Sequence, residues 1–161
     1  MLTASGPTVL EYNCRLGDPE TQPIMMRMDF DLAAAFDAVA SRKLDTIKPA
    51  WKPGASVCVV MASGGYPGAF ETGKKITGLV EAASLPDVAV FHAGTKRDGD
   101  SIVTSGGRVL GVTAIGDSLP QAIRKAYEAT GKIRFDGAQC RTDIGAKGDL
   151  RSTMAVEVPR V

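Results

Sequence analysis

The feature that most limits how this chain can fold is a run of apolar and β-branched residues, Ser56 to Ala62, set between two breaks. A loop that contains two prolines and a glycine, DTIKPAWKPGA, precedes the run, and the glycine-rich turn SGGYPG follows it. An apolar run of this length bounded by turn residues is typical of a buried strand. We therefore expect a buried strand over residues 56–62.

Other segments predict the neighbours of that strand. The sequence DGD at 98–100 has the composition of a hairpin turn and would join two antiparallel strands. The 18 glycines cluster in GG and SGG loops, which permit tight turns between short strands. We expect a mostly antiparallel sheet. Its further strands would be Val88 to His92, Ser101 to Thr104, Arg108 to Ile115, Ile133 to Phe135 and Ala138 to Arg141.

Two regions have helical periodicity. Thr21 can cap a helix that begins at Gln22, and apolar residues recur at helical spacing across a break near 29–31 until about Leu44. Ser118 and Gln121 have the spacing of a capping box, ahead of a helix that Gly131 would end. Helices around 22–43 and 118–130 beside an antiparallel sheet predict an α+β fold.

Composition excludes several functional classes. The chain has 161 residues, of which 44% are hydrophobic and 23% charged, as expected for one soluble domain. A net charge of +1 disfavours a nucleic-acid surface. No apolar run is long enough for a bilayer and the N-terminus lacks signal-peptide features, so we expect no membrane partner and a cytoplasmic location. Three widely spaced cysteines, without a CxxC pair, predict reduced and mostly buried thiols.

The stretch LEYNCRLGDPETQP, residues 10–23, is the candidate for a functional site. Alternation over residues 8–15 predicts a half-buried strand that places Glu11, Asn13 and Arg15 on one face. A carboxylate and a carboxamide offer the oxygen ligands that Mg²⁺ prefers, and an arginine can bind a phosphoryl group through two hydrogen bonds. The alternative is that these residues are solvated on the outer face of an edge strand, and spacing alone does not decide.

The hexapeptide Arg15 to Glu20, RLGDPE, resembles the signature of phosphoribosylamine-glycine ligase, also called glycinamide ribonucleotide synthetase. The resemblance continues through several further blocks in the order found in that family, over roughly residues 1–145. These blocks are LEYNCRLGDPETQPIM, VVMASGGYPG, ITG, VFHAGT, TSGGRVLGVTA and CRTDIG.

The resemblance implies an ATP-grasp ligase of de novo purine synthesis that joins phosphoribosylamine to glycine, with ATP as a substrate and magnesium or manganese as the metal. It implies that Glu11 and Asn13 bind the metal and that Arg15 is catalytic and contacts substrate, stabilising the glycyl phosphate. Asp18 and Glu20 are weaker candidates for substrate binding, and they fit equally well as turn and helix-start residues. Arg108 is a candidate for contacting the substrate phosphate.

The family's enzymes are more than twice as long as this chain, so the resemblance implies a C-terminal portion. Residues 1–28 would be the last strand and helix of the ATP-grasp module, 29–145 the family's C-terminal domain, and 146–161 an unmatched tail. We expect this chain alone to be inactive and to need the missing N-terminal part in trans. An unpaired leading strand also predicts a homodimer formed through that strand.

Two alternatives for the whole chain and one for a single residue remain at this point. The chain could be a binding or assembly module that kept the fold and lost the chemistry. It could derive from another ATP-grasp ligase, such as a carboxylase of the biotin type, although Gly17 to Glu20 disfavour that origin. The single histidine, His92, is an acid-base candidate, but a packed or surface position on a strand is the simpler interpretation.

Overall fold

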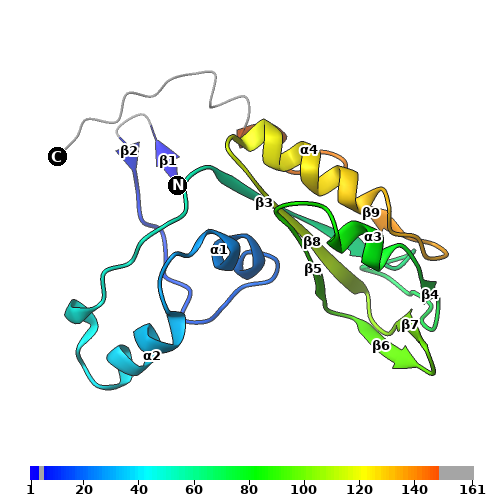
Figure 1. Ribbon diagram of the computed structural model, residues 1–161, viewed down its shortest axis with the longest axis horizontal. Coiled ribbons are helices and arrows are strands. Elements are labelled where there is room, and N and C mark those ends of the chain that lie inside the picture. The colour runs from blue at the N-terminus through cyan, green and yellow to red at the C-terminus, as the bar shows by residue number, and fades with distance from the viewer. Residues whose placement is uncertain (4–5, 149–161) are drawn as a thin grey trace.

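The computed structural model describes residues 1–3 and 6–148 and contains an α+β fold (Figure 1). Its strands form a four-stranded sheet, a three-stranded sheet and a short hairpin, and the strand pairings among these residues are all antiparallel. The predicted fold class is therefore confirmed. Of the tail at 146–161, residues 149–161 lie outside the described residues.

The four-stranded sheet is built around the predicted buried strand and has the order β5-β8-β3-β9. In its longest pairing, between β3 and β8, Val59 lies opposite Val112. The strands are β3 (Ala55–Ala62), β5 (Val88–His92), β8 (Arg108–Gly116) and β9 (Gln139–Cys140).

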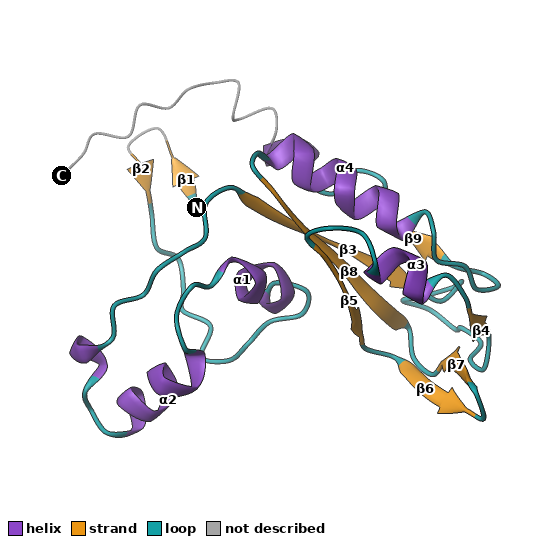
Figure 2. Ribbon diagram, in the orientation of Figure 1, coloured by secondary structure: helices purple, strands orange, loops and turns teal. Residues whose placement is uncertain are grey.

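The three-stranded sheet has the order β4-β7-β6 (Figure 2). Its strands are β4 (Lys75–Ile76), β6 (Thr95–Asp98) and β7 (Ser101–Thr104). Asp98 pairs with Ser101, which confirms the hairpin turn predicted at 98–100.

Helices cover both faces of the four-stranded sheet, as Figure 1 shows. Helices α3 (Leu79–Ala83) and α4 (Leu119–Thr130) lie on one face, and α1 (Thr21–Arg27) lies against the other. Successive strand residues point to opposite faces, so Val57 and Val59 pack against α4, while Cys58 points toward α1. The sheet is therefore covered on both sides near its centre.

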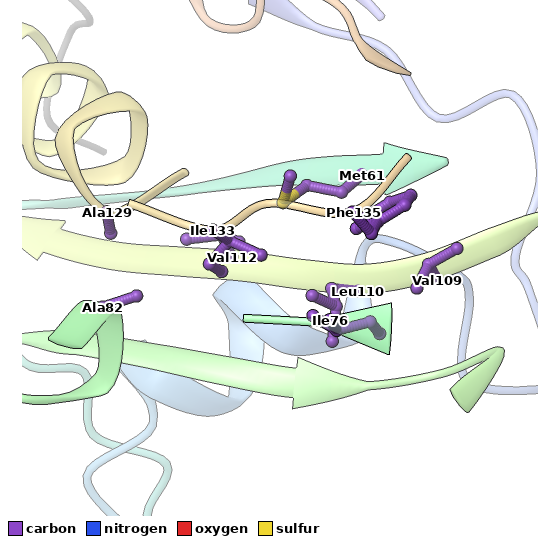
Figure 3. Packing of buried hydrophobic residues seen from close by; sticks show 9 residues of the cluster. All are labelled: Met61, Ile76, Ala82, Val109, Leu110, Val112, Ala129, Ile133 and Phe135. Carbon is purple, nitrogen blue, oxygen red and sulfur yellow. The ribbon is translucent and has the colours of Figure 1, made fainter. Parts of the chain in front are cut away.

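The core lies between the sheet and the helices α3 and α4. Figure 3 shows one of its two clusters, in which Leu110 and Val112 of β8 meet Ile133 and Phe135 from the segment after α4. Val112 is fully buried and Leu110 is 1% exposed. Full burial of an aliphatic side chain of this size stabilises the fold by about 1.5–3 kcal/mol, so these residues anchor the domain.

Residues 1–54 are organised differently. They contain a short hairpin, a second helix and a single 3-10 turn, and only Ala35 and Ala38 of their described residues are buried. Asp31 caps the second helix by accepting hydrogen bonds from the backbone N–H groups of Ala33 and Ala34. The elements are β1 (Leu2–Thr3), β2 (Gly6–Pro7), α2 (Leu32–Ala40) and η1 (Leu44–Thr46).

Helix α2 belongs to an excursion that is closed at its base and projects away from the sheet (Figure 1). The backbone N–H of Asp29 donates to the carbonyl of Ala50 over 3.0 Å, and that of Lys52 donates to Arg27 over 2.8 Å. The rings of Phe30 and Trp51 meet edge to face at 5.9 Å. The excursion over 29–52 is thus held by local contacts and not by the main core.

The half-buried strand predicted over residues 8–15 is wrong. The segment has no strand structure, and Leu10 and Tyr12, the residues expected to be buried, are 69% and 82% exposed. A strand needs a neighbour for its backbone groups and apolar cover for one face, and no described strand pairs with this segment. Alternation in the sequence indicates a face but does not supply its partner.

A second strand prediction also fails. Ile133 and Phe135 are buried as expected, but the segment makes only an isolated bridge, between Arg134 and Thr77. The three residues cross the core as a connection instead of extending a sheet. The predicted strand over 138–141 is confirmed in its centre as β9.

The helix predictions hold with changes at the ends. Helix α1 begins at Thr21, one residue early, and α2 ends at Ala40 and not near Leu44. The capping box predicted between Ser118 and Gln121 is wrong. The side chain of Gln121 accepts from the backbone N–H of Asp117, whereas Ser118 makes no side-chain cap hydrogen bond. The helices in the described part of the chain are too short or too polar to cross a membrane.

Candidate functional site around the β3 trough

A pocket of about 560 Å³ lies along β3, and we call it the β3 trough. Cys58, Val60 and Ala62 line it. They alternate along β3 and so share the face opposite the one that packs on α4. This apolar row forms the floor of the trough.

The walls of the trough come from both sides of β3, because β8 and β9 flank this strand. Arg108 of β8 contributes to one wall, together with Pro19, Tyr66 and Pro67. The other wall is formed by residues of β9 and the segment that follows it. These are Gln139, Cys140, Arg141 and Ile144.

A β-bulge places Arg108 in the trough. In β8, Leu110 pairs with Met61 and Arg108 pairs with Ala62, so Val109 is an extra residue between them. Without the bulge, Arg108 would share a face with Leu110 and point toward the core. With it, Val109 and Leu110 are both buried and Arg108 points into the trough.

The two glycine-rich loops, SGGYPG and SGGR, pack against each other at this end of the trough. Ser63 donates from its backbone N–H to the carbonyl of Gly107 over 2.8 Å and from its hydroxyl to Gly106 over 2.9 Å. The ring of Tyr66 lies directly against Gly107, where a Cβ would overlap it. The glycine therefore lets Tyr66 reach Arg108, which is more than the simple turn that a GG pair predicts.

Arg108 joins the sheet to the GDPE turn. Its Nε donates to the hydroxyl of Tyr66 over 3.1 Å, and its Nη1 donates to the backbone carbonyl of Asp18 over 2.8 Å. The same Nη1 lies 3.2 Å from the Asp18 carboxylate. The hydrogen bond to Tyr66 and then that to Asp18 raise the pKa of the Arg108 guanidinium. Two residues predicted separately as substrate contacts are thus brought together as a tether.

The GDPE turn leads directly into α1. The hydroxyl of Thr21 donates to the carbonyl of Gly17 over 2.5 Å, and the backbone N–H of Thr21 donates to the same oxygen. The side chains of Arg15 and Glu20 both lie next to Gly17, so a Cβ there would lie 3.2 Å from Nη1 of Arg15 and would overlap Glu20. The turn therefore brings Arg15 and Glu20 close to one another.

Glu11 and Asn13 stand apart from this arrangement. Both are exposed, neither lines the trough, and neither has a hydrogen bond or ion pair with another described residue. Their donor set, one carboxylate and one carboxamide, suits Mg²⁺, which keeps waters and substrate phosphates as its other ligands. Within residues 1–3 and 6–148, no group of three histidine, cysteine or acidic side chains is placed to hold a metal. The pair therefore fits as a partial ligand set.

The wall formed after β9 is fixed by a tyrosine and an ion pair. The hydroxyl of Tyr127 donates to the carbonyl of Arg141 over 2.8 Å and accepts from the backbone N–H of Ile144 over 3.0 Å. Arg141 binds Asp143 through two hydrogen bonds, of 2.8 and 2.6 Å, which lower the pKa of the Asp143 carboxyl. These contacts hold the segment 141–144 between α4 and the trough.

No motif in the sequence predicted Tyr66, Gln139 and Arg141 as wall residues. The side-chain amide of Gln139 donates to the carbonyl of Tyr66 over 2.9 Å and so joins one wall of the trough to the other. Tyr66 is far in the sequence from Gln139 and Arg141, and only the order of the strands brings it close to them. No local spacing could have found them.

One other candidate, His92, takes no part in the site, and the cysteines differ from their predicted burial. His92 is exposed on β5 and its Nδ1 lies 3.0 Å from the hydroxyl of Thr95, so the interpretation as a surface strand histidine is confirmed. Cys58 is buried, and burial raises the pKa of its thiol more than the neighbouring Thr113 hydroxyl lowers it. Cys14 and Cys140 are exposed, so the prediction of mostly buried thiols is wrong.

Comparison with known proteins shows which family this chain resembles. Residues 56–147 match the family model described as phosphoribosylglycinamide synthetase, C domain. Phosphoribosylamine--glycine ligase of Rhodopirellula baltica is 51% identical over 148 residues, which cover 91% of this chain and 34% of that protein. The Vibrio vulnificus ligase is 50% identical over 145 residues, covering 90% of this chain and 34% of its own length.

A solved structure agrees. The crystal structure of phosphoribosylamine--glycine ligase from Thermotoga maritima superposes with a TM-score of 0.66 at 37% identity and covers 89% of this chain and 34% of that one. The chain thus spans about a third of the length of the relatives it matches. These matches reject the alternative origin in a carboxylase of the biotin type. The chain belongs to the phosphoribosylglycinamide synthetase family and carries its C domain.

Proposed function

We propose that this chain is the C-terminal part of an ATP-dependent ligase that joins phosphoribosylamine to glycine in purine biosynthesis, and that it is active only together with the remaining part. The observation that carries the proposal is the extent of the similarity. A match of 148 residues cannot fit within residues 56–161, so it extends upstream of the family model into the segment that holds the candidate site residues. The relatives matched there are named as the ligase.

The proposal assigns a metal role to Glu11 and Asn13, with magnesium or manganese as the ion. Bound there, the ion would neutralise negative charge on the phosphates of ATP. The two side chains supply hard oxygen ligands and are free of other partners among the described residues. Their exposure leaves them open to the rest of the enzyme.

Arg15 is the proposed catalytic residue. Its guanidinium would stabilise the charge that develops when the glycine carboxylate is phosphorylated, as fixed donors do in acyl and phosphoryl transfer. Its position beside Gly17 and Glu20, in a turn tethered by Arg108, supports a fixed orientation. Asp18, Glu20 and Arg108 remain proposed substrate contacts, and the tether gives Asp18 and Arg108 a second, positioning role.

Several further expectations stay predictions. We propose residues 1–28 as the end of the ATP-grasp module and 29–145 as the C-terminal domain, with a cytoplasmic location. Glycine, phosphoribosylamine and ATP would be the ligands of the combined enzyme, with no nucleic acid or membrane partner. Homodimerisation through residues 8–15 also stays a prediction, but the segment offers no strand edge in this structure.

The test measures ADP release from ATP, Mg²⁺, glycine and freshly made phosphoribosylamine. The chain is assayed alone and then mixed with the N-terminal part of the Rhodopirellula baltica ligase. We expect activity only in the mixture, lost in Glu11→Ala and kept in the matched variant Glu81→Ala, whose side chain is on α3. Activity of the chain alone would overturn the proposed dependence on a second part.

A silent mixture would point to the alternative class. If the two parts associate but release no ADP, the chain is better described as a binding or assembly module that kept the fold without the chemistry. Association is measured by analytical ultracentrifugation of the same mixture, so that a failure to assemble is not mistaken for lost chemistry.

A further inference from the structure

The β3 trough combines an apolar floor with an arginine on each wall. Arg108 and Gln139 both pair across Ala62, one on β8 and one on β9, so they lie in one row across the sheet. Adjacent strands are about 4.8 Å apart, which puts the two flanking strands roughly 10 Å from each other. Arg141 follows Gln139 by two residues and lines the same trough. An anion above Ala62 is therefore within reach of both guanidinium groups.

Each guanidinium is held in place and keeps one free nitrogen. Arg108 uses Nε and Nη1 for Tyr66 and Asp18. Arg141 uses Nε and Nη2 for Asp143. Within the described part of the chain, Nη2 of Arg108 and Nη1 of Arg141 have no hydrogen-bond partner. Fixed guanidinium groups lose less conformational entropy on binding, so they are suited to recognise an anion.

We propose that the β3 trough binds the phosphorylated sugar portion of the substrate, with Arg108 and Arg141 donating to the phosphate from opposite walls. The inference rests on the proposed function for the identity of the sugar phosphate. A phosphate monoester carries nearly two negative charges at neutral pH, so it can bind the two guanidinium groups although Asp18 and Asp143 each pair with one of them. The floor of Cys58, Val60 and Ala62 provides apolar contact for the carbon face of a ribose.

Size and composition separate this ligand from the other two substrates. Pockets for small ligands measure about 300–1,000 Å³, and the trough of about 560 Å³ is far larger than glycine requires. A nucleotide base usually needs an aromatic or deep apolar slot. In the trough, the ring of Tyr66 packs on Gly107 and its hydroxyl binds Arg108, so the ring does not form such a slot. A sugar phosphate therefore fits better than glycine or ATP.

The test is a titration of the isotope-labelled 161-residue chain with ribose 5-phosphate, followed by amide and arginine Nε resonances in NMR spectra. We expect shifts at Ala62, Gln139 and Arg141, with much weaker responses to ribose and to glycine. Arg141→Gln should weaken binding about 10-fold or more, in line with the loss of a charge-assisted hydrogen bond. Arg141→Lys should weaken it less, and the matched variant Arg97→Gln on β6 should leave it unchanged.

The amide spectra of each variant show whether it is folded, so a loss of binding is interpretable. No response to ribose 5-phosphate, an equal response in Arg141→Gln, or stronger binding of ADP in the trough would each overturn the inference. The titration needs no ATP and no second part of the enzyme. Binding without activity in the mixture would therefore overturn only the proposed function.

Discussion

Residues 55–148 and residues 1–54 differ in how their apolar side chains are used. The first region buries a continuous core around β3, β8 and α4, whereas the second buries only two alanines among its described residues. Apart from Phe70 and Val80, every exposed large hydrophobic residue in the described part of the chain lies in 1–54. Large exposed apolar patches mark interaction surfaces, so residues 1–54 are the region that we expect to contact another protein surface. The region that holds Glu11, Asn13 and Arg15 is the one that lacks its own core.

The largest expected effect is a contrast between two truncations of apolar side chains. Leu110→Ala empties a site that is 1% exposed and should lower the free energy of unfolding by about 2–5 kcal/mol. Phe36→Ala removes a larger side chain that is 56% exposed and should change it by less than about 0.5 kcal/mol. Urea unfolding followed by circular dichroism measures both. Equal losses of unfolding free energy in the two variants would show that α2 shares the main core, so the two regions would not differ as described.

A smaller effect is expected where the two regions meet. Gly107→Ala places a methyl group against the ring of Tyr66 and should displace the ring from Arg108. The cost should be about 1–3 kcal/mol, as for other overpacked sites. The matched variant Gly131→Ala lies at the end of α4 in helical geometry and should be nearly neutral.

Gly107→Ala also tests whether Arg108 connects the GDPE turn of residues 1–54 to the sheet of residues 55–148. NMR should show the resonances of Asp18 and Thr21 moved in Gly107→Ala and unmoved in Gly131→Ala, because Arg108 connects the turn to the sheet. If Asp18 is unaffected when Tyr66 moves, the tether does not position the turn.

The smallest effect concerns the wall formed by residues 141–144. The hydrogen bonds from Arg141 lower the pKa of Asp143 below its ordinary value of 3.8. The stabilisation from this pair is therefore present above that value and is lost as the pH falls through the lower folded-state pKa. An NMR titration of the Asp143 carboxyl carbon should give a midpoint below 3.8, restored toward 3.8 in Arg141→Gln. An unchanged midpoint would show that the pair does not persist in solution.

The sequence predicted the region with a core better than the region without one. The strand at 56–62, the hairpin at 98–100 and the helix before Gly131 follow from local signals, namely β-branched runs, turn residues and helical spacing. These signals agree with the tertiary contacts in that region. The alternation of residues 8–15 is an equally clear local signal, but no described strand is there to pair with it.

The candidate site also contains parts that local motifs predicted and parts that depend on tertiary structure. Local motifs predicted roles for Arg15, Asp18 and Arg108, but not that Arg108 binds Asp18. That contact depends on the bulge at Val109 and on the packing of Tyr66 against Gly107, which no pattern in the sequence encodes. The wall with Arg141 depends on the position of β9 beside β3, which is a property of the topology.

The central claim is that residues 8–16, which pair with no described strand here, become ordered only against the part of the proposed ligase that this chain does not span. Amide hydrogen exchange measured by mass spectrometry tests it most directly, on the chain alone and mixed with the N-terminal part of the Rhodopirellula baltica ligase. We expect slow exchange in β3, β8 and α4 in both samples, and fast exchange at 8–16 that slows markedly in the mixture. Protection of 8–16 in the chain alone, or no gain of protection in an associated mixture, would contradict it.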